Sequence, residues 1–317
     1  MINGIKNKNN ISNNYKLSHF LKILKQDKWL YIFLIPIVLY YIIFKYLPML
    51  GVMIAFKDFR FADGIFGSSW IGFQHFARMF SNQDFYNIVK NTLLLNIYDV
   101  LFGFPVPIIL AVMLNEISSR HFRKITQSIL YLPHFLSWVV LGGIILQICS
   151  PSSGVINSII SSLGGTPIYF MANAQWWIVV FVVSGIWQGA GWGTIIYLAA
   201  ITGIDVQLYE AARIDGAGKF KQIWHITLPG IRGTIATMLI LRMGSMMNIG
   251  FEKVYMLQNN AVRRVSEVIS TYVYRLGIES AQFSYTTAIG LFQSVISLIL
   301  VFTTNKIIKS MGESGLW

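Results

Sequence analysis

Few side chains in this 317-residue chain could take part in covalent or metal chemistry. The five histidines are scattered and show none of the close spacings that zinc sites use. Cys149 is the single cysteine, so no internal disulfide can form. The segment 215–219 is superficially similar to a phosphate-binding loop, but Arg213 and Phe220 stand where that loop needs a glycine and a hydroxyl residue. We therefore expect no catalysis, no metal and no cofactor bound by this chain.

The polar segment 205–229 is the most strongly patterned part of the chain. Helix-forming residues run from Gln207 to Ile214, and Gly216 follows as a stop because glycine can adopt the left-handed conformation. A second helical stretch, Lys219–Thr227, leads to Pro229 at the entry of the next apolar run. The pattern predicts two short helices joined by a turn.

The side chains of the first short helix suit docking better than catalysis. Ala211 and Ala212 are small, so a helix that carries them can lie deep in a groove of another protein. Glu210 beside them can supply a directional charged contact at the edge of that groove. The segment is therefore predicted to bind a partner.

The composition is that of a membrane protein. Hydrophobic residues make up 55% of the chain and charged residues 12%, against about a quarter charged in soluble domains. A bilayer core requires about 20 apolar residues per helix. Six stretches qualify, at 29–50, 91–114, 126–148, 176–199, 228–250 and 285–304. We expect an all-α integral membrane protein with six transmembrane helices and a cytoplasmic docking helix between the fourth and the fifth.

The distribution of basic residues predicts the orientation. The first 28 residues hold six lysines and one acidic residue, Asp27, whereas 149–175 contains no Lys or Arg. This positive-inside asymmetry places both termini in the cytoplasm, so the net charge of +12 indicates topology and not a nucleic-acid partner. The predicted parts are a basic cytoplasmic tail at 1–28, a transmembrane domain at 29–305 and a cytoplasmic C-terminal tail at 306–317.

One predicted outside loop has aromatic residues at helical spacing. Trp70, Phe73, Phe76 and Phe80 predict a short amphipathic helix over 70–80, lying on the membrane surface. It could be an interfacial anchor or a seat for an external partner.

The docking segment also resembles a known motif. The spacing EAA, three residues, G, nine residues, I-x-L-P resembles the coupling-loop signature of permease subunits in binding-protein-dependent ABC importers. The segments 44–56, 70–80, 131–140, 191–205 and 209–229 are similar to maltose-type carbohydrate permeases, in particular those for polysaccharide fragments. Through this resemblance, the residues that couple the chain to an ATPase are Glu210, Ala211, Ala212, Asp215, Gly216, Ile226, Leu228 and Pro229.

The resemblance implies a transport subunit of the bacterial cytoplasmic (inner) membrane, and not an enzyme. A separate partner ATPase would use ATP and Mg²⁺. The implied partners are a second homologous permease in a heterodimer, two copies of the cytoplasmic ABC ATPase and an extracytoplasmic solute-binding protein. The implied cargo is a carbohydrate, an oligosaccharide from polysaccharide breakdown, acidic or neutral, that crosses by alternating access.

Ionisable residues inside apolar segments are candidates for the substrate pathway, because they are costly there. Asp99 and Arg242 lie in the middle of two predicted spans, at similar depth, so they could form an ion pair. Alternatively, Arg242 could meet an acidic sugar such as a uronate, or a group on the second permease.

Uncharged polar and aromatic residues extend this set of pathway candidates. Indole rings can pack on sugar rings while amides bond hydroxyl groups, although the same residues suit a bilayer-interface belt or helix packing. These further candidates are Trp187, Gln188, Trp192, Asn248 and Gln293.

Two other readings stay open. An ion-coupled secondary carrier would need several intramembrane carboxylates, and the apolar segments offer Asp99. An ABC permease for a solute other than a sugar would share the coupling loop.

Overall fold

The structure, a computed structural model, describes residues 26–313 and 315–316, so the predicted basic tail lies almost wholly outside the described residues. The described chain is mostly helical, as predicted. Its one strand pairing is an antiparallel ribbon of β1 (Lys57–Asp58) and β2 (Ser69–Trp70), in which Lys57 lies opposite Trp70.

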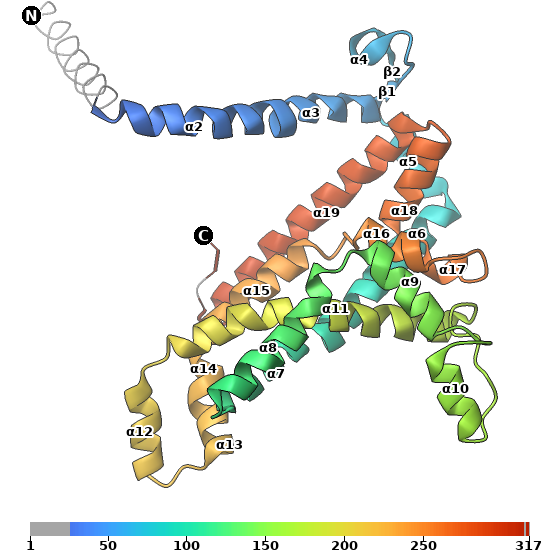
Figure 1. The fold of residues 1–317 in the computed structure, drawn as a ribbon. Helices are drawn as coiled ribbons and strands as arrows, with labels where there is room; N and C mark the ends of the chain where they lie inside the picture. The colour runs from blue at the N-terminus through green and yellow to red at the C-terminus, as the bar shows by residue number, and fades with distance from the viewer. Residues whose placement is uncertain (1–25, 314, 317) are drawn as a thin grey trace, which may run out of the picture.

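Four helices of the described chain are long and apolar enough to cross a membrane, or five if one bent pair counts as a span. They match the predicted stretches 29–50, 91–114, 176–199 and 285–304. Two are compound: Lys28–Phe56 joins α2 (Lys28–Tyr41), η1 (Ile42–Tyr46), α3 (Leu47–Met49) and η2 (Leu50–Phe56), and Gln83–Glu116 joins α6 (Gln83–Tyr98), η3 (Asp99–Gly103) and α7 (Pro105–Glu116). The other two are α11 (Ala174–Thr202) and α19 (Phe283–Ser310) (Figure 1).

The predicted stretch 126–148 is a bent pair of helices and not one straight span. The first arm joins α8 (Arg120–Tyr131) to η4 (Leu132–Phe135), the second is α9 (Trp138–Ile148), and the axes differ by 102°. Ser137 begins the second arm, because its Oγ accepts a hydrogen bond from the Val140 amide at 3.4 Å.

The predicted stretch 228–250 is also interrupted. It contains α14 (Leu228–Gly230) and the 13-residue α15 (Arg232–Gly244), separated by the non-helical Ile231. The chain leaves the helix at Ser245. A single straight span over 228–250 is therefore wrong for this structure.

Three helical turns are widened to the π form directly before a proline. The turns are η1, η3 and η5 (Ile223–Thr227), and the prolines are Pro48, Pro105 and Pro229. Proline has no N–H, so it cannot complete the usual bond to the carbonyl four residues earlier. In each case the residue just before the proline donates its N–H five residues back, as Phe104 does to Asp99 at 3.1 Å. The helices thus continue past the prolines.

Helix α11 passes through the centre of the fold and packs against several other helices. Trp177 near its start is fully buried and donates from Nε1 to the carbonyl of Leu257 at 2.8 Å. This bond ties α11 to α16 (Phe251–Leu257). The remaining short helices are α4 (Gly64–Gly67), α5 (Gln74–Ser81), α10 (Val155–Ser162), α12 (Val206–Ile214), α13 (Lys219–Gln222), α17 (Arg263–Ser266), α18 (Ile269–Tyr274) and η6 (Arg275–Glu279).

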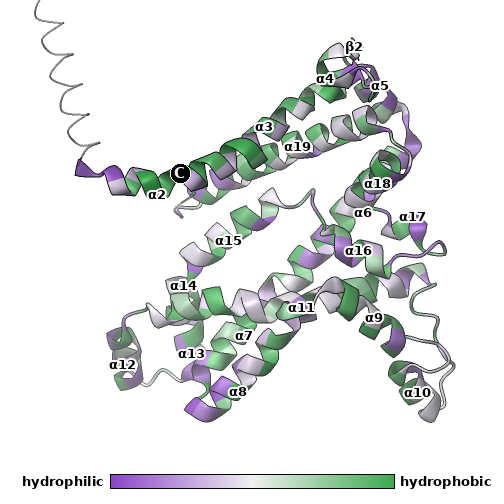
Figure 2. Cartoon of the chain, turned by 45° about the horizontal axis from the view of Figure 1, so that its top comes forward, coloured by the Kyte–Doolittle hydropathy of each residue, from purple (hydrophilic) through white to green (hydrophobic). Residues whose placement is uncertain are grey.

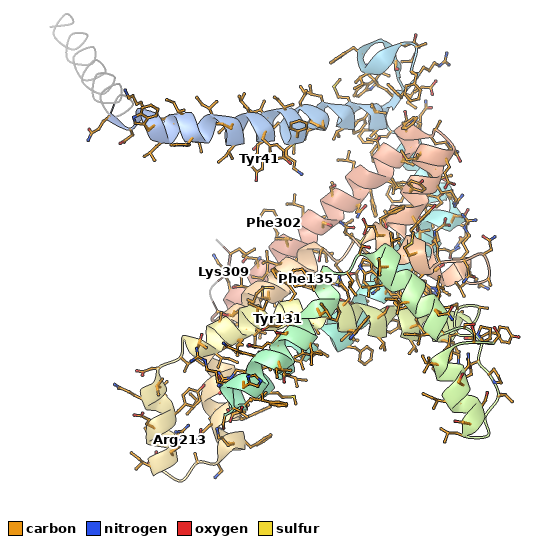
Figure 3. All side chains as sticks on the ribbon, in the orientation of Figure 1. Tyr41, Tyr131, Phe135, Arg213, Phe302 and Lys309 are labelled. Carbon is orange, nitrogen blue, oxygen red and sulfur yellow. The ribbon has the colours of Figure 1, made fainter. Side chains whose placement is uncertain are left out.

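The first long helix lies largely outside the packed bundle. None of its most apolar window is buried, and Figure 3 shows Tyr41 projecting from it into open space. Only its last part, η2, packs against α19. Figure 2 shows apolar residues along α2, α3 and α9, whereas polar residues gather on α13 and near α17. The exposed apolar surfaces are those expected of helices that face lipid or another membrane subunit.

The amphipathic helix predicted over 70–80 begins later, at Gln74, and Trp70 belongs to β2. It is part of the fold, since Met79 is fully buried and the Arg78 guanidinium lies 4.5 Å from the ring centroid of Tyr285 on α19. Phe73 and Phe80 stay exposed.

Candidate functional site: a docking loop and two pockets

The docking segment folds as the pattern predicts. Asp205 caps α12, because its Oδ1 accepts a hydrogen bond from the amide of Gln207 at 2.9 Å. The helix ends at Ile214, and Gly216, two residues later, has a φ of +75°. The next amide, Ala217, donates to the carbonyl of Ala212 at 2.8 Å, which completes a glycine-based helix stop. The conformation at Gly216 is one that a side chain would disfavour.

The second half of the segment returns beside the first. It consists of α13, η5 and α14, and it is tied to α12 by a hydrogen bond of 2.9 Å between the hydroxyls of Tyr209 and Thr227. Within the returning half, Gln222 donates to the carbonyl of Ala217 at 2.7 Å. We call the whole segment, residues 205–229, the coupling loop.

The coupling loop presents an exposed surface away from the bundle. Figure 1 shows α12 and α13 projecting beyond the other helices, and Figure 3 marks Arg213 on this projection. Ile214 is 87% exposed and Phe220 is 78% exposed, and Glu210 is exposed beside Ala211. Exposed apolar residues next to a charged one are typical of a surface that another protein covers.

Three structural elements connect the coupling loop to the bundle. Helix α11 ends at Thr202, directly before the loop, and α15 starts at Arg232, directly after it. Lys219 forms an ion pair with Glu116 at the end of α7. A displacement of the loop therefore acts on α7, α11 and α15 together.

Two pockets lie one after the other along α11. The pocket nearer the coupling loop, which we call the loop-side pocket, has a volume of about 370 Å³. It is lined by Gly103, Phe104, Pro107, Gly193, Tyr197 and Met238, among others. The distal pocket, of about 270 Å³, includes Asn96, Trp138, Phe181, Gln188, Asn248 and Lys253 in its lining. Asp99, Gly185, Gly189 and Arg242 line both pockets.

An ion pair between Asp99 and Arg242 stands where the two pockets meet. Arg242 Nη2 donates to Asp99 Oδ2 and, at 3.3 Å, to Oδ1 of the buried Asn96. Its Nη1 donates to Ser245 Oγ at 3.4 Å. Each charged side chain is about a third exposed, at 31% and 32%. The sequence left open whether these residues pair, and the structure pairs them.

Asp99 occupies a special position in its helix. It is the first residue of the π-helical turn η3, whose last residue precedes Phe104 and Pro105. Widened turns of this kind are common at functional positions. The proline at 105 therefore contributes to the placement of the carboxylate.

Glycines open the face of α11 that borders the pockets. Gly185, Gly189 and Gly193 are four residues apart and line the loop-side pocket, as residues on one helix face do. Gly191 lies on another face of the helix, where a Cβ would collide with the carbonyl oxygen of Leu130. Gly185, Gly189 and Gly193 thus keep the pocket wall open, whereas Gly191 allows close helix packing.

The other predicted pathway residues divide into two groups. Gln188 and Asn248 line the distal pocket. Trp187 instead borders an apolar groove beside α9, and Trp192 stacks on His134 with ring centroids 4.8 Å apart. Gln293 donates to the carbonyl of Met247 at 2.7 Å, in the turn after α15. Trp187, Trp192 and Gln293 do not line the two pockets.

The pocket residues that the sequence did not predict include Asn96, Trp138 and Lys253. Trp138 begins α9 after the bend, so only the bend turns it toward α11. Lys253 lies beyond the apolar stretch 228–250, in the short helix that follows the break after α15. The polar Asn96, within the predicted span 91–114, was the available signal.

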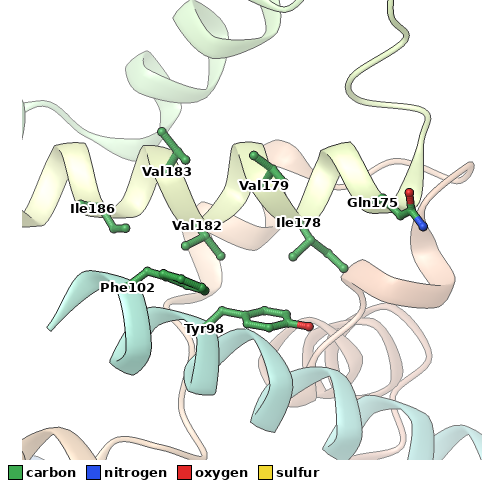
Figure 4. A pocket seen from close by; sticks show the side chains of 8 residues that line it. All are labelled: Tyr98, Phe102, Gln175, Ile178, Val179, Val182, Val183 and Ile186. Carbon is green, nitrogen blue, oxygen red and sulfur yellow. The ribbon is translucent and has the colours of Figure 1, made fainter. Parts of the chain in front are cut away.

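A third hollow, between α6–η3 and α11, has a different character. Figure 4 shows apolar side chains from both helices facing it, with Tyr98 and Phe102 on one side. Gln175 at one end is its one amide-bearing residue. Such a surface suits lipid or another membrane helix better than a hydrophilic solute.

Apolar helices, a protruding loop and two pockets that share an ion pair are typical of the membrane subunit of a transporter. The family described as binding-protein-dependent transport system inner membrane component matches residues 90–312, and the chain belongs to this family. The resemblance recognised in the sequence is confirmed.

Individual relatives agree with this assignment. The chain is 48% identical to Protein LplB of Bacillus subtilis, over 93% of this chain and 92% of LplB. It is 45% identical to the polygalacturonan/rhamnogalacturonan transport system permease protein YteP of the same organism, over 92% and 91% of the two chains. A solved bacterial ABC transporter that imports the acidic polysaccharide alginate has a chain that matches with a TM-score of 0.86 and 40% identity, over 92% of this chain and 99% of that chain. The chain is thus a permease subunit of an ABC import system and not an enzyme.

Proposed function

We propose that this permease imports oligosaccharides released from polysaccharides, acidic ones included, by ATP-driven alternating access. Its relatives transport polygalacturonan or rhamnogalacturonan and alginate, which are acidic polysaccharides. The distal pocket combines an indole ring, amide groups and cationic side chains. Rings can pack on the apolar faces of sugars, amides can bond their hydroxyl groups, and cations can bind carboxylates.

The proposed topology has six membrane spans with both termini in the cytoplasm. The four long helices supply four spans, the bent pair at 120–148 a fifth, and the interrupted segment 228–250 a sixth. The positive-inside pattern supports a cytoplasmic coupling loop. The location is the bacterial cytoplasmic membrane.

The proposed complex contains a second, homologous permease, two copies of a cytoplasmic ABC ATPase and an extracytoplasmic solute-binding protein. The alginate transporter has been solved together with its oligosaccharide-bound periplasmic protein, and one of its chains matches with a TM-score of 0.86. Both pockets are open at their sides, so a second permease is needed to close the pathway. ATP and Mg²⁺ are used by the ATPase, and this chain binds no cofactor.

The observation that carries the mechanism is the position of the coupling loop. The loop joins α11, which carries the glycine wall, to α15, which carries Arg242, and Lys219 connects it to the α7 end of the helix with Asp99. When the ATPases close, they move the loops. The three helices that meet at the ion pair then shift relative to one another, and access changes from the distal to the loop-side pocket.

The proposal is tested by uptake into proteoliposomes that contain this permease with its partner permease, ATPase and binding protein. The panel comprises short oligogalacturonates, oligoalginates and neutral arabino- and chito-oligosaccharides, each with and without ATP. ATP-dependent uptake of at least one oligosaccharide class is expected. Uptake without ATP, or uptake restricted to solutes that are not sugars, would contradict the proposal.

A further inference from the structure

Lys253 brings a second cation into the distal pocket. Its Nζ lies 3.7 Å from the ring centroid of Phe181 and 5.2 Å from that of Trp138. The two rings belong to α11 and α9, so the ammonium is held between two helices. Cation–π contacts of this kind position an ammonium without neutralising its charge.

The ammonium group of Lys253 has hydrogen-bond donors without an acceptor among the described residues. Among the described residues, Lys253 takes part in no hydrogen bond or ion pair, because the nearby Asp99 is engaged by Arg242. Lys57, the buried lysine of β1, is different: its Nζ donates to the carbonyls of Ile65 and Phe66 at 2.8 and 3.0 Å. A lysine has three N–H donors, and those of Lys253 are available to a ligand.

The backbone of α11 makes room for this ammonium. A Cβ at position 185 would collide with Lys253 Nζ, so a glycine is required at 185 for the side chain to lie as it does. Gly185 also lines both pockets. Residues of two helices, α16 and α11, therefore determine where the ammonium lies.

The groups around Lys253 define the chemistry of a ligand. Lys253 and Arg242 line the pocket with one carboxylate, Asp99, so with Lys253 protonated the pocket carries a positive excess that attracts anions. Gln188 and Asn248 add amides that can bond hydroxyl groups. We infer that Lys253 is the specificity-determining residue that binds a carboxylate of an anionic oligosaccharide, an inference that rests on the proposed import of oligosaccharides.

Another role would leave the same cluster in place. In that role, Lys253 would balance the charge of Asp99 and support the packing of α16 on α9, and would do nothing else. Such a structural role makes no distinction between acidic and neutral cargo, whereas a carboxylate-binding role does. The ratio of the two uptake rates therefore separates the roles.

The experiment uses the complete transporter in proteoliposomes and matched pairs of cargo. Short oligogalacturonates and oligoalginates are each compared with their carboxyl-reduced, neutral forms, together with the cognate binding protein. Lys253→Met removes the charge with little change in length, Lys253→Arg keeps it, and Lys306→Met is the control on the exposed surface of α19. ATP hydrolysis by each reconstituted complex reports assembly.

For the wild type and Lys306→Met, we expect a preference for the acidic form. Lys253→Met should reduce that preference about ten- to a hundredfold, the range for losing one charge-assisted bond, with uptake of the neutral form retained. Lys253→Arg should keep most of it. An equal loss of both forms in Lys253→Met, or an unchanged ratio, would overturn the inference. If the wild type imports the reduced and acidic forms equally, the inference about Lys253 is wrong, but the proposed import of oligosaccharides is still supported. If the wild type imports neither form, the proposed function itself is wrong.

Discussion

Arg242 and Asp99 form an ion pair at the boundary between the two pockets, and each comes from a helix that is attached to the coupling loop. Arg242 lies on α15, which begins directly after the loop. Asp99 lies on the helix whose far end, Glu116, is paired with Lys219 of the loop. The pair therefore joins two helices that are attached to the loop, at the boundary between the two pockets.

Removing one partner of this pair should impair transport more than removing both. Asp99→Ala leaves Arg242 partly buried with only Asn96 and Ser245 as partners. Because both side chains are about a third exposed, we expect a cost of about 1–2 kcal/mol, below the 3–5 kcal/mol of a fully buried pair. The free energy of unfolding is measured for Asp99→Ala, Arg242→Ala and the double variant, and this double-mutant cycle should give a coupling energy of about 1 kcal/mol. ATP-driven uptake is measured for the same three variants.

The chain provides a matched pair as the control. Arg60 and Asp58 are paired at 3.4 Å, but their side chains are 72% and 52% exposed. The same three alanine variants there should change stability by less than about 0.5 kcal/mol and leave uptake intact. Additive effects at Asp99 and Arg242 would show that the pair is not a functional unit.

The charge of Glu210 should be required for coupling to the ATPase. Glu210→Lys reverses an exposed charge on α12, so the subunit should still fold and assemble. We expect ATP-dependent uptake to fall at least about tenfold, as when a charge-assisted contact is lost. Glu279→Lys, at the exposed last residue of η6, is the control and should retain uptake. Normal uptake by Glu210→Lys at normal expression would refute the docking role of this residue.

The sequence predicted the coupling loop well, because its pattern is local. The helix near 207–214 and the stop at Gly216 follow from residue types alone, and the structure contains both. The similar depth of Asp99 and Arg242 followed from counting residues along two apolar stretches.

The distal pocket was less predictable, because it depends on breaks in helices. The bend of 102° that turns Trp138 inward lies at the extended residues Leu136 and Ser137, and a serine at that place is equally compatible with a continuous apolar stretch. Lys253 comes into the pocket only because the chain leaves α15 at Ser245 and forms a separate short helix. Neither break changes hydropathy enough to be seen in a window of membrane-spanning length.

Gly216 should tolerate no side chain, whereas Gly218 should. Gly216 has a φ of +75°, a conformation that costs other residues about 1–2 kcal/mol. Gly218 precedes α13 with a φ of −68°, where serine is a favourable helix cap. Neither glycine has atoms within 4 Å of a Cβ, so crowding is excluded as a cause. Gly216→Ser should reduce ATP-driven uptake several-fold and Gly218→Ser should not; equal uptake by the two variants would show that the loop does not need this turn.

The hydrogen bond between Tyr209 and Thr227 should hold the two halves of the coupling loop together. Tyr209→Phe removes the hydroxyl and nothing else, at a cost of about 1 kcal/mol. Because the bond joins α12 to η5, its loss should loosen α12 more than the long helices. Hydrogen exchange of the amides at 206–214 should then become several times faster, while exchange within α11 is unchanged. Tyr169→Phe, at a residue that is 65% exposed, is the control. If exchange in α12 stayed at the wild-type rate, contacts other than this hydrogen bond would hold the two halves of the loop together.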